Sequence, residues 1–199
     1  MATHQVKLKN RREVAEGTMA FHFEKPPGFA FKAGQALAWT LIDPPETDNE
    51  GGMRNFSIAS APGEPDLMIA TRMRDTAFKR VFKTMPLGTE VRIVGPFGSL
   101  TLRQNAARPA VFLAGGIGIT PFRSMLRQAT EQELLHHLFL FYSNRRPEDA
   151  AFLEELEELE KENSNYNFNG TMTEMAGSNR VWRGETGFIN QERLAGDAG

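Results

Sequence analysis

The feature that most constrains this chain is a short apolar run that ends in a glycine-rich turn, residues 111–121, VFLAGGIGITP. A run of this kind predicts a buried strand that turns abruptly into a helix. Thr120 is expected to cap the helix, and Pro121 suits its first turn because the missing N–H would have no partner there. The glycines of the turn leave no side chain to hold a ligand away from the backbone. They are Gly115, Gly116 and Gly118.

Free amides and the positive end of the helix dipole at this turn favour a bound phosphate or pyrophosphate. The glycine spacing departs from the full G-x-G-x-x-G dinucleotide fingerprint, so an ordinary tight strand-to-helix turn is the alternative. The motif therefore needs support from the rest of the chain before it identifies a binding site.

Composition excludes several classes of protein. The 199 residues carry a formal net charge of -2, so the charge balance indicates neither a nucleic-acid partner nor an acidic membrane surface. The chain has no cysteine, which excludes disulfides and thiolate-ligated iron–sulfur or zinc sites within it, and no metal site is expected. No apolar run approaches the length of a membrane span and residues 1–12 contain no signal-peptide core, so we expect a soluble cytoplasmic protein. The sequence leaves the oligomeric state open.

The hydrophobic pattern changes near residue 104, which predicts two domains. Residues 1–103 contain short antiparallel strands, the last at 100–102, and one brief helix, a pattern typical of a small Greek-key β-barrel. Residues 104–109 form the predicted linker. Residues 110–199 alternate strand and helix, which predicts a parallel α/β sheet of Rossmann-like type with its ligands at the carboxyl ends of the strands. The expected strands are 110–114, 137–142 and 166–173, and the expected helices are 121–131 and 147–162.

A candidate flavin site lies in the strand that begins at Arg54. Strand alternation puts Arg54, Phe56 and Ile58 on one face, and an arginine beside an aromatic residue is unusual in a plain core. A guanidinium for a pyrophosphate, a ring for ring stacking and the hydroxyl of Ser57 for a hydrogen bond would suit a flavin. An edge-strand arginine beside a core phenylalanine is the alternative.

Two further segments carry candidate anion-binding residues. The helix predicted to open at 75–76 contributes free amides near Thr76 and a lysine, Lys79, in its first turn, which would hold a phosphate. In the loop after the strand 137–142, Asn144 and Arg145 occupy a position that can bind the adenosine ribose or its 2′-phosphate. In both segments solvated surface charges are the alternative.

Taken together, three motifs in this order resemble the signatures of the ferredoxin–NADP reductase superfamily: RNFSI at 54–58, GPFG at 95–98 and AGGIGITP at 114–121. The resemblance covers nearly the whole chain from about Val6 onward. It implies an FAD-binding barrel followed by an NAD(P)-binding domain. In that family the residue matching Ser57 lies near the flavin N5, so Ser57 is the implied catalytic residue.

The resemblance also implies which residues bind the cofactors. The implied FAD-binding residues are Arg54, Asn55, Phe56, Ser57, Ile58, Thr71, Arg72, Met73, Thr76, Ala77, Phe78 and Lys79. The implied NAD(P)H-binding residues are Gly115, Gly116, Gly118, Thr120, Pro121, Asn144 and Arg145.

Three departures from the family pattern affect these expectations. Thr76 and Lys79 stand where the family has a glycine and a serine, which adds a lysine charge to the expected phosphate contact. The segment Thr173-Glu174 contains no basic residue of the kind that often accompanies a 2′-phosphate, so the sequence leaves the choice between NADH and NADPH open. The family's later strand with its Cys-Gly-Pro segment is missing, which leaves an unpaired sheet edge. We expect a piece of a longer reductase, with completion by another subunit as the alternative.

The expected function is that of a flavin-dependent oxidoreductase. It would pass a hydride from NAD(P)H to FAD, and the electrons would go on to a ferredoxin, an oxygenase component or a ferric compound. One alternative is a non-catalytic FAD-binding module for electron transfer or regulation. Another is a flavin-free protein that binds a partner.

Overall fold

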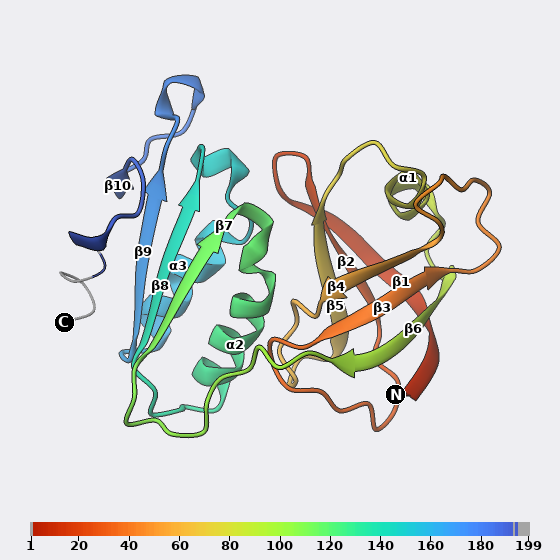
Figure 1. The fold of residues 1–199 in the computed structure, drawn as a ribbon, viewed down its shortest axis with the longest axis horizontal. Coiled ribbons are helices and arrows are strands. Elements are labelled where there is room, and N and C mark those ends of the chain that lie inside the picture. Colours follow the sequence, from red (N-terminus) through yellow and green to blue (C-terminus); the bar gives the residue numbers. More distant parts are fainter. Residues whose placement is uncertain (1, 193, 195–199) are drawn as a thin grey trace.

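Two structural units lie side by side in the computed structural model, which describes residues 2–192 and residue 194 (Figure 1). The first is antiparallel and barrel-like, and the second is a parallel sheet with helices. The two-part fold class expected from the sequence is therefore confirmed.

The first unit is a six-stranded antiparallel sheet with strand order β4-β3-β6-β1-β2-β5. Its elements are β1 (Ala2–Ala15), β2 (Thr18–Glu24), β3 (Ala36–Leu41), β4 (Met53–Ser57), β5 (Asp66–Arg72), α1 (Ala77–Thr84) and β6 (Glu90–Phe97). The strand β1 begins at Ala2 despite its polar sequence, because it pairs with both β2 and β6, and it buries only a few side chains such as Val6. One detail of the prediction is wrong. Residues 100–102 form no strand, since the chain has already left the barrel after β6.

Aromatic side chains fill the centre of this unit. Phe23 of β2 and Trp39 of β3 are fully buried, and their ring centroids lie 4.7 Å apart. The helix α1 turns Phe78 and Phe82 into the same core, while Thr76 caps it by accepting a hydrogen bond from the backbone N–H of its third residue at 3.4 Å. The amphipathic sequence of α1 therefore fixes it to the barrel with its basic residues outward.

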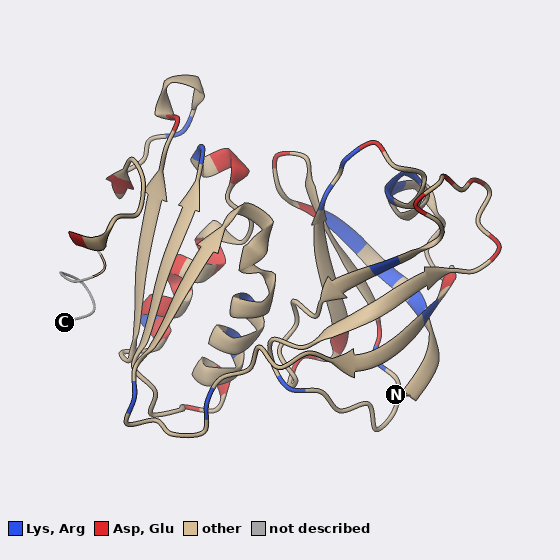
Figure 2. Cartoon of the chain, in the orientation of Figure 1, with Lys and Arg blue, Asp and Glu red and all other residues tan. Residues whose placement is uncertain are grey.

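The second unit is a four-stranded parallel sheet with strand order β10-β9-β8-β7. Its strands are β7 (Ala110–Gly115), β8 (Leu138–Asn144), β9 (Tyr166–Met172) and β10 (Glu185–Thr186), its helices are α2 (Thr120–Glu131) and α3 (Leu153–Glu162), and its 3-10 helices are η1 (Gly116–Ile119), η2 (Pro147–Asp149) and η3 (Met175–Gly177). Leu126 of α2 and Leu156 of α3 are fully buried in one cluster with Leu140 and Tyr142 of β8. The glutamates of α3 leave its remaining surface strongly acidic (Figure 2).

The helix predicted at 147–162 is interrupted. The short η2 is followed by an irregular stretch, and α3 begins only at Leu153, after Phe152 has adopted a left-handed φ of 62°. The backbone N–H of Phe152 donates to Val14 O of β1 at 3.4 Å, and the Tyr142 hydroxyl lies 3.2 Å from Ala151 O. Contacts with other elements thus replace the helical hydrogen bonds that the sequence pattern predicts.

Arg123 of α2 joins the two units. Its side chain is 5% exposed, and all five of its N–H groups have acceptors. Nη1 donates to Ala59 O at 2.7 Å, Nη1 and Nη2 donate to Glu64 at 2.8 and 3.2 Å, and Nε and Nη2 donate to Glu155 at 3.0 and 2.6 Å. Ala59 and Glu64 belong to the barrel and Glu155 to α3. A second interdomain bond runs beside it, from the Ser124 hydroxyl to a barrel carbonyl at 2.6 Å.

Residues 2–192 and 194 contain neither a membrane-spanning helix nor a cluster of metal-binding side chains. No helix in this part of the chain is long and apolar enough to span a membrane. The same residues include no group of three or more His, Asp or Glu placed to hold a metal ion. The ring of His136, for example, makes one hydrogen bond to the described residues, from Nε2 to Arg103 O at 2.7 Å.

Candidate functional site: a basic cleft between the two units

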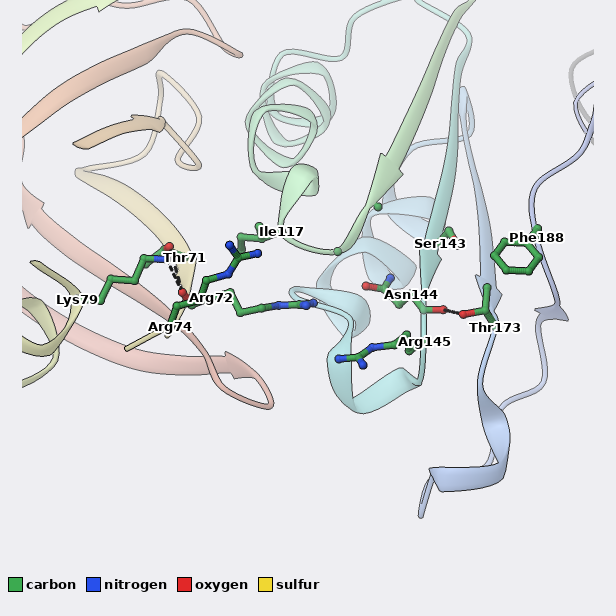
Figure 3. A pocket seen from close by; sticks show the side chains of 12 residues that line it. Thr71, Arg72, Arg74, Lys79, Ile117, Ser143, Asn144, Arg145, Thr173 and Phe188 are labelled. Atoms are coloured by element: carbon green, nitrogen blue, oxygen red, sulfur yellow. Dashed lines mark hydrogen bonds between the residues drawn. The ribbon is translucent and has the colours of Figure 1, made fainter. Parts of the chain in front are cut away.

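A cleft of about 450 Å³ lies between the barrel and the parallel sheet. The strands of the sheet end at this cleft together, because Gly115 pairs with Ser143 in parallel register and Ser143 pairs in turn with Thr171. The lining residues come from both units (Figure 3) and are Thr71, Arg72, Arg74, Lys79, Gly115, Gly116, Ile117, Ser143, Asn144, Arg145, Thr173 and Phe188. The cleft thus lies where ligands bind to parallel sheets, at the carboxyl ends of the strands.

Positive charge dominates the cleft. Arg72, Arg74 and Lys79 come from the barrel side and Arg145 follows β8 (Figure 3), while the described lining includes no aspartate or glutamate. Burial, together with the charges of Arg74 and Arg54, holds the pKa of Lys79 below its ordinary value. The Lys79 ammonium donates to Arg72 O at 2.7 Å, which fixes its position. A cleft lined by four cations and no carboxylate favours an anionic ligand such as a phosphate ester.

The glycine-rich turn lines the cleft with exposed backbone. Gly116 has a φ of 51°, and a Cβ at this position would lie 3.2 Å from Nη2 of Arg72. A side chain at Gly116 would therefore strain the backbone and displace the arginine. The Tyr142 hydroxyl shares its proton between Gly116 O at 3.1 Å and Ala151 O at 3.2 Å, and burial raises the pKa of Tyr142, so this anchor stays protonated.

The helix after the turn begins differently from the prediction. The 3-10 helix η1 runs directly into α2, so Ile119 is the N-cap residue and no side chain caps the helix. The Thr120 hydroxyl donates to Ile117 O at 3.3 Å, and the Thr120 N–H bonds to the same carbonyl. The predicted capping by Thr120 is therefore wrong, because η1 already supplies acceptors for the amides that a cap would serve. Pro121 does occupy the first turn.

Asn144 has a hydrogen-bonding side chain that the protein leaves unused. It is the last residue of β8, is 6% exposed and lines the cleft. Neither its side-chain oxygen nor its side-chain nitrogen makes a hydrogen bond of normal geometry among the described residues, although the carboxamide lies near enough to the Tyr142 hydroxyl to lower its pKa slightly against the effect of burial. Its backbone carbonyl, in contrast, accepts from the N–H of Thr173 at 2.9 Å. Because a buried amide without partners costs free energy, the Asn144 carboxamide fits a site for a polar ligand.

The residues predicted to hold the flavin form a second group, on the barrel. The guanidinium carbon of Arg54 lies 5.3 Å from the centre of the Phe78 ring, and the Phe56 ring centroid lies 5.9 Å from that of Phe78. Arg54 Nη1 lies 2.8 to 2.9 Å from two backbone carbonyls of the preceding loop and from the carbonyl of Met53 at the start of β4, and donates to them. Its Nη2 donates to the Glu50 carboxylate at 2.7 Å. Because its charge also acts on Lys79, Arg54 belongs to the same electrostatic environment as the cleft.

A carboxylate already occupies the start of α1 beside Arg54. Asp48 Oδ2 accepts from the backbone N–H of Ala77 at 2.7 Å, and its Oδ1 lies 3.7 Å from Arg54 Nη2. This hydrogen bond from Ala77 holds the pKa of Asp48 below its ordinary value. An oxyanion held by a helix N-terminus and a guanidinium is the arrangement that a phosphate uses. The site therefore fits the pyrophosphate of FAD, with Asp48 as the stand-in anion.

The cleft brings together seven of the residues implied by the family resemblance. They are Thr71, Arg72, Lys79, Gly115, Gly116, Asn144 and Arg145. Others lie elsewhere: Asn55 is exposed, Ile58 is fully buried in the barrel core, Ser57 is half-buried at the end of β4 and Met73 packs against the barrel core. Roles in cofactor binding or catalysis stay predictions for all of them.

The cleft also contains residues that were not among the candidates. They are Arg74, Ile117, Ser143, Thr173 and Phe188. Ser143 and Thr173 could have been found, because they stand at the ends of two predicted parallel strands. Phe188 could not have been found, because no sequence motif marks it as a site residue. It is 80% exposed and follows the two-residue strand β10, and only the tertiary fold brings it to the cleft.

Comparison with known proteins places the chain in a family. Residues 112–198 match the family model of the oxidoreductase NAD-binding domain. Ferredoxin–NADP reductase B of Sorangium cellulosum is 33% identical over 84% of this chain and 67% of its own length. The glycine betaine monooxygenase reductase subunit of Pseudomonas aeruginosa is 29% identical over 89% of this chain and 48% of its own length. The chain thus spans about half to two thirds of these relatives.

A solved structure gives the same result for the fold. The ferredoxin–NADP reductase of Neisseria gonorrhoeae, determined with bound FAD and NADP, superposes with a TM-score of 0.77 at 22% identity, over 97% of this chain and 75% of that one. A likeness at this identity bears on the fold alone. Together with the sequence relatives, it means that this chain belongs to the ferredoxin–NADP reductase superfamily, a family of NAD(P)H-dependent flavoprotein oxidoreductases.

Proposed function

We propose that this chain binds FAD on its barrel and NAD(P)H in the basic cleft, and that it passes electrons from NAD(P)H through FAD to a protein acceptor. The observation that carries this proposal is the cleft itself. Its basic side chains come from the barrel, whereas the glycine turn and the unpartnered Asn144 carboxamide come from the parallel sheet. A ligand in the cleft therefore contacts both units at once.

On the barrel, Arg54 and the first amides of α1 would hold the FAD pyrophosphate. The face of Phe56 offers a surface for the flavin ring, and the Ser57 hydroxyl offers a hydrogen bond at its edge. In the cleft, the backbone of the glycine turn and the charge of Arg145 would bind NAD(P)H, whose phosphates the barrel arginines would also attract.

FAD, when bound, supplies the chemistry of accepting a hydride and releasing its electrons singly. The protein's task is to hold the two cofactors in contact and to keep water away. The clamp of Arg123 on Ala59 and Glu64 supports this task, because Ala59 lies only two residues beyond Ser57. A fixed interdomain geometry at this point fixes the distance between the barrel site and the cleft.

The acceptor is the least constrained part of the proposal. The relatives are named as a ferredoxin–NADP reductase and as the reductase component of an oxygenase, which favours a ferredoxin or an oxygenase component over a ferric compound. A small ferric acceptor is the second candidate because the cleft is open to solvent on one side, where Phe188 is exposed.

The test is a visible absorption spectrum of the purified chain with FAD, before and after anaerobic addition of NADH or NADPH. We expect a bound-flavin spectrum that bleaches within the mixing time. Arg54→Ala should weaken FAD retention by about tenfold or more, since charge-assisted hydrogen bonds are each worth about 1.5–3 kcal/mol. Arg92→Ala, which removes an exposed arginine elsewhere on the barrel, is the control and should retain FAD normally.

Other outcomes identify the alternatives. Bound flavin that stays oxidised with both nucleotides would make the chain a non-catalytic FAD-binding module. A colourless preparation that binds no FAD would overturn the proposal and leave a partner-binding protein. Unchanged FAD retention in Arg54→Ala would refute the assignment of the pyrophosphate to Arg54.

A further inference from the structure

The loop between β3 and β4, residues 43–52, is acidic, and we call it the acidic loop. Three of its carboxylates contact α1 or β4. Glu46 accepts from the Arg80 guanidinium of α1 at 2.6 to 3.2 Å, on the outer side of that helix. Asp48 accepts from the first amide of α1, and Glu50 accepts from Arg54. Figure 2 shows the acidic residues of this loop next to the basic residues of α1.

Two of these three contacts use the groups that are assigned to the FAD phosphates. The backbone N–H of Ala77 can donate one hydrogen bond, and it donates that bond to Asp48 Oδ2 at 2.7 Å. Arg54 Nη2 donates to Glu50 at 2.7 Å and lies 3.7 Å from Asp48. A phosphate oxygen at the same donors would stand beside two carboxylates, so the loop carboxylates and a phosphate exclude each other by both hydrogen bonding and charge.

We propose that the acidic loop is a specificity element of the cofactor site: Asp48 and Glu50 compete with the ligand's phosphates for Ala77 and Arg54, so that phosphate-bearing flavins bind only with the loop displaced. The inference rests on the proposed function, because it takes the flavin site from there.

The burial of the carboxylates sets the size of the effect. The side chain of Glu50 is 65% exposed and that of Asp48 is 31% exposed, so water weakens both contacts. A pyrophosphate offers more charge and more acceptor oxygens than the two carboxylates, and it wins the competition at sufficient concentration. The carboxylates of Asp48 and Glu50 belong to the same chain as the donors, however, so they are present at the site at a high effective concentration. The loop therefore weakens FAD binding without abolishing it, and the bound flavin exchanges with free flavin.

The experiment measures dissociation constants of FAD, FMN and riboflavin by flavin fluorescence quenching, in the full 199-residue chain. The variants are Asp48→Asn, Glu50→Gln and the pair combined. Asp48→Asn keeps an oxygen that can accept from Ala77 and removes only the charge, and the cap of α1 by Thr76 is untouched. We expect the double variant to bind FAD about tenfold more tightly than the original chain. Riboflavin, which has no phosphate, should bind equally to both, and FMN should fall between.

Glu46→Gln is the matched control. It breaks an ion pair between the same loop and the same helix, but Arg80 is no part of the flavin site, so FAD binding should stay unchanged. Equal tightening by Glu46→Gln would mean that loop anchoring, and not competition for phosphate donors, controls binding, and it would overturn the inference. The inference is also overturned by weaker FAD binding in the double variant, or by an equal gain for riboflavin.

Failure of the proposed function would look different. If neither the original chain nor any variant binds any flavin, the flavin site itself is refuted and the inference falls with it. If all of them bind FAD with the same dissociation constant, the flavin site stands and only the role of the acidic loop is refuted. Circular dichroism and thermal unfolding of each variant establish that the chains compared are folded.

Discussion

Asn144 combines burial, a polar side chain and the absence of any hydrogen bond of normal geometry to the described residues. Asn163 offers a comparison, because it is buried to a similar degree but both ends of its carboxamide are used. Its Nδ2 donates to Thr130 Oγ1 at 3.2 Å, and its Oδ1 accepts from the backbone N–H of Asn165 at 3.0 Å. The protein therefore stabilises itself with one asparagine and leaves the other available at the cleft.

Replacing Asn144 by leucine tests whether a ligand uses this carboxamide. We expect Asn144→Leu to leave the free energy of unfolding within about 1 kcal/mol of the original value, because no protein hydrogen bond is lost. NADH or NADPH should bind at least several-fold more weakly. Urea unfolding and nucleotide titration measure the two quantities.

The control for this variant is Asn163→Leu. It should lower the free energy of unfolding by about 1–3 kcal/mol, since it leaves buried partners unsatisfied, and it should not change nucleotide binding. If Asn144→Leu instead destabilised the chain as much as Asn163→Leu does and bound nucleotide normally, the Asn144 carboxamide would have a structural role.

At the residue scale, the sequence proposed candidate residues where local chemistry was sufficient. The glycine turn and Arg145 could be proposed because they follow the ends of predicted parallel strands, whereas Arg72 came only from the family resemblance. The absence of a cap at Thr120 could not be predicted. It depends on whether the backbone before Thr120 is extended or forms a 3-10 helix, and the tertiary packing of η1 decides between the two.

Among the elements, α2 has two functions. Its amino-terminal end continues from the glycine turn, and its middle carries Arg123, the residue that connects the barrel to α3. Although burial by itself would lower the pKa of Arg123, the hydrogen bonds and charges of Glu64 and Glu155 raise it, so the side chain stays charged.

Arg123→Met tests this connection. The substitution removes the cation between Glu64 and Glu155 and leaves Glu155 with only the more distant Arg127, 3.8 Å away, and we expect it to lower the free energy of unfolding by about 3–5 kcal/mol. Arg127→Met, one helical turn further along, is the matched control. Arg127 pairs with Glu131 at 3.2 Å, lies 3.8 Å from the same Glu155 and is 28% exposed, so its loss should cost less than about 1 kcal/mol. Urea denaturation of both variants measures the difference, and equal losses would contradict a special role for Arg123.

The elements were predicted well where the hydrophobic period was regular and less well where another element intervened. Leu153, Leu156 and Leu159 recur at helical spacing and are all buried, which is why α3 was found. Its start was placed six residues too early, because the hydrogen bond from Phe152 to β1 of the barrel has no signature in the local sequence. The long polar strand β1 likewise has little local signature, since its partners β2 and β6 supply the stabilising backbone pairing.

At the scale of the whole molecule, ion pairs join the two units, Arg123 with Glu64 and Arg146 with Glu16, which makes their association sensitive to acid. Burial by itself would raise the pKa of Glu64, but the hydrogen bonds and charge of Arg123 outweigh it and hold the pKa below its ordinary value. A carboxyl whose pKa is lower in the folded chain than in the unfolded chain contributes stability above its unfolded pKa. That contribution disappears as the pH falls through the folded pKa.

We therefore expect the free energy of unfolding to decrease as the pH is lowered from about 5 to about 3. Glu64→Gln should make this decrease shallower, since its side chain no longer titrates, while also lowering the stability at neutral pH. Glu162→Gln, at the exposed end of α3, serves as the control and should leave the slope unchanged. Urea denaturation at a series of pH values measures the slope, and an unchanged slope in Glu64→Gln would contradict the role of the Arg123 contact.

The parallel sheet has an open edge at β7. Among the described residues β7 pairs only with β8, and Val111 and Leu113 of β7 are 45% and 53% exposed. The glycine betaine relative is about twice as long as the matched region. The sheet of this chain is thus a partial version of the family fold.

The sequence by itself determined the two-part fold, the family and the strand-end residues of the cleft, because periodicity, turn chemistry and short motifs are local properties. The tertiary structure alone decided three further features. It placed Arg72, Arg74 and Lys79 of the barrel opposite Arg145 of the sheet, it gave Arg123 five acceptors from both units, and it set Asp48 on the first amide of α1. Each of these joins residues far apart in the chain, and the free energy of such contacts depends on distances and burial that no local pattern encodes.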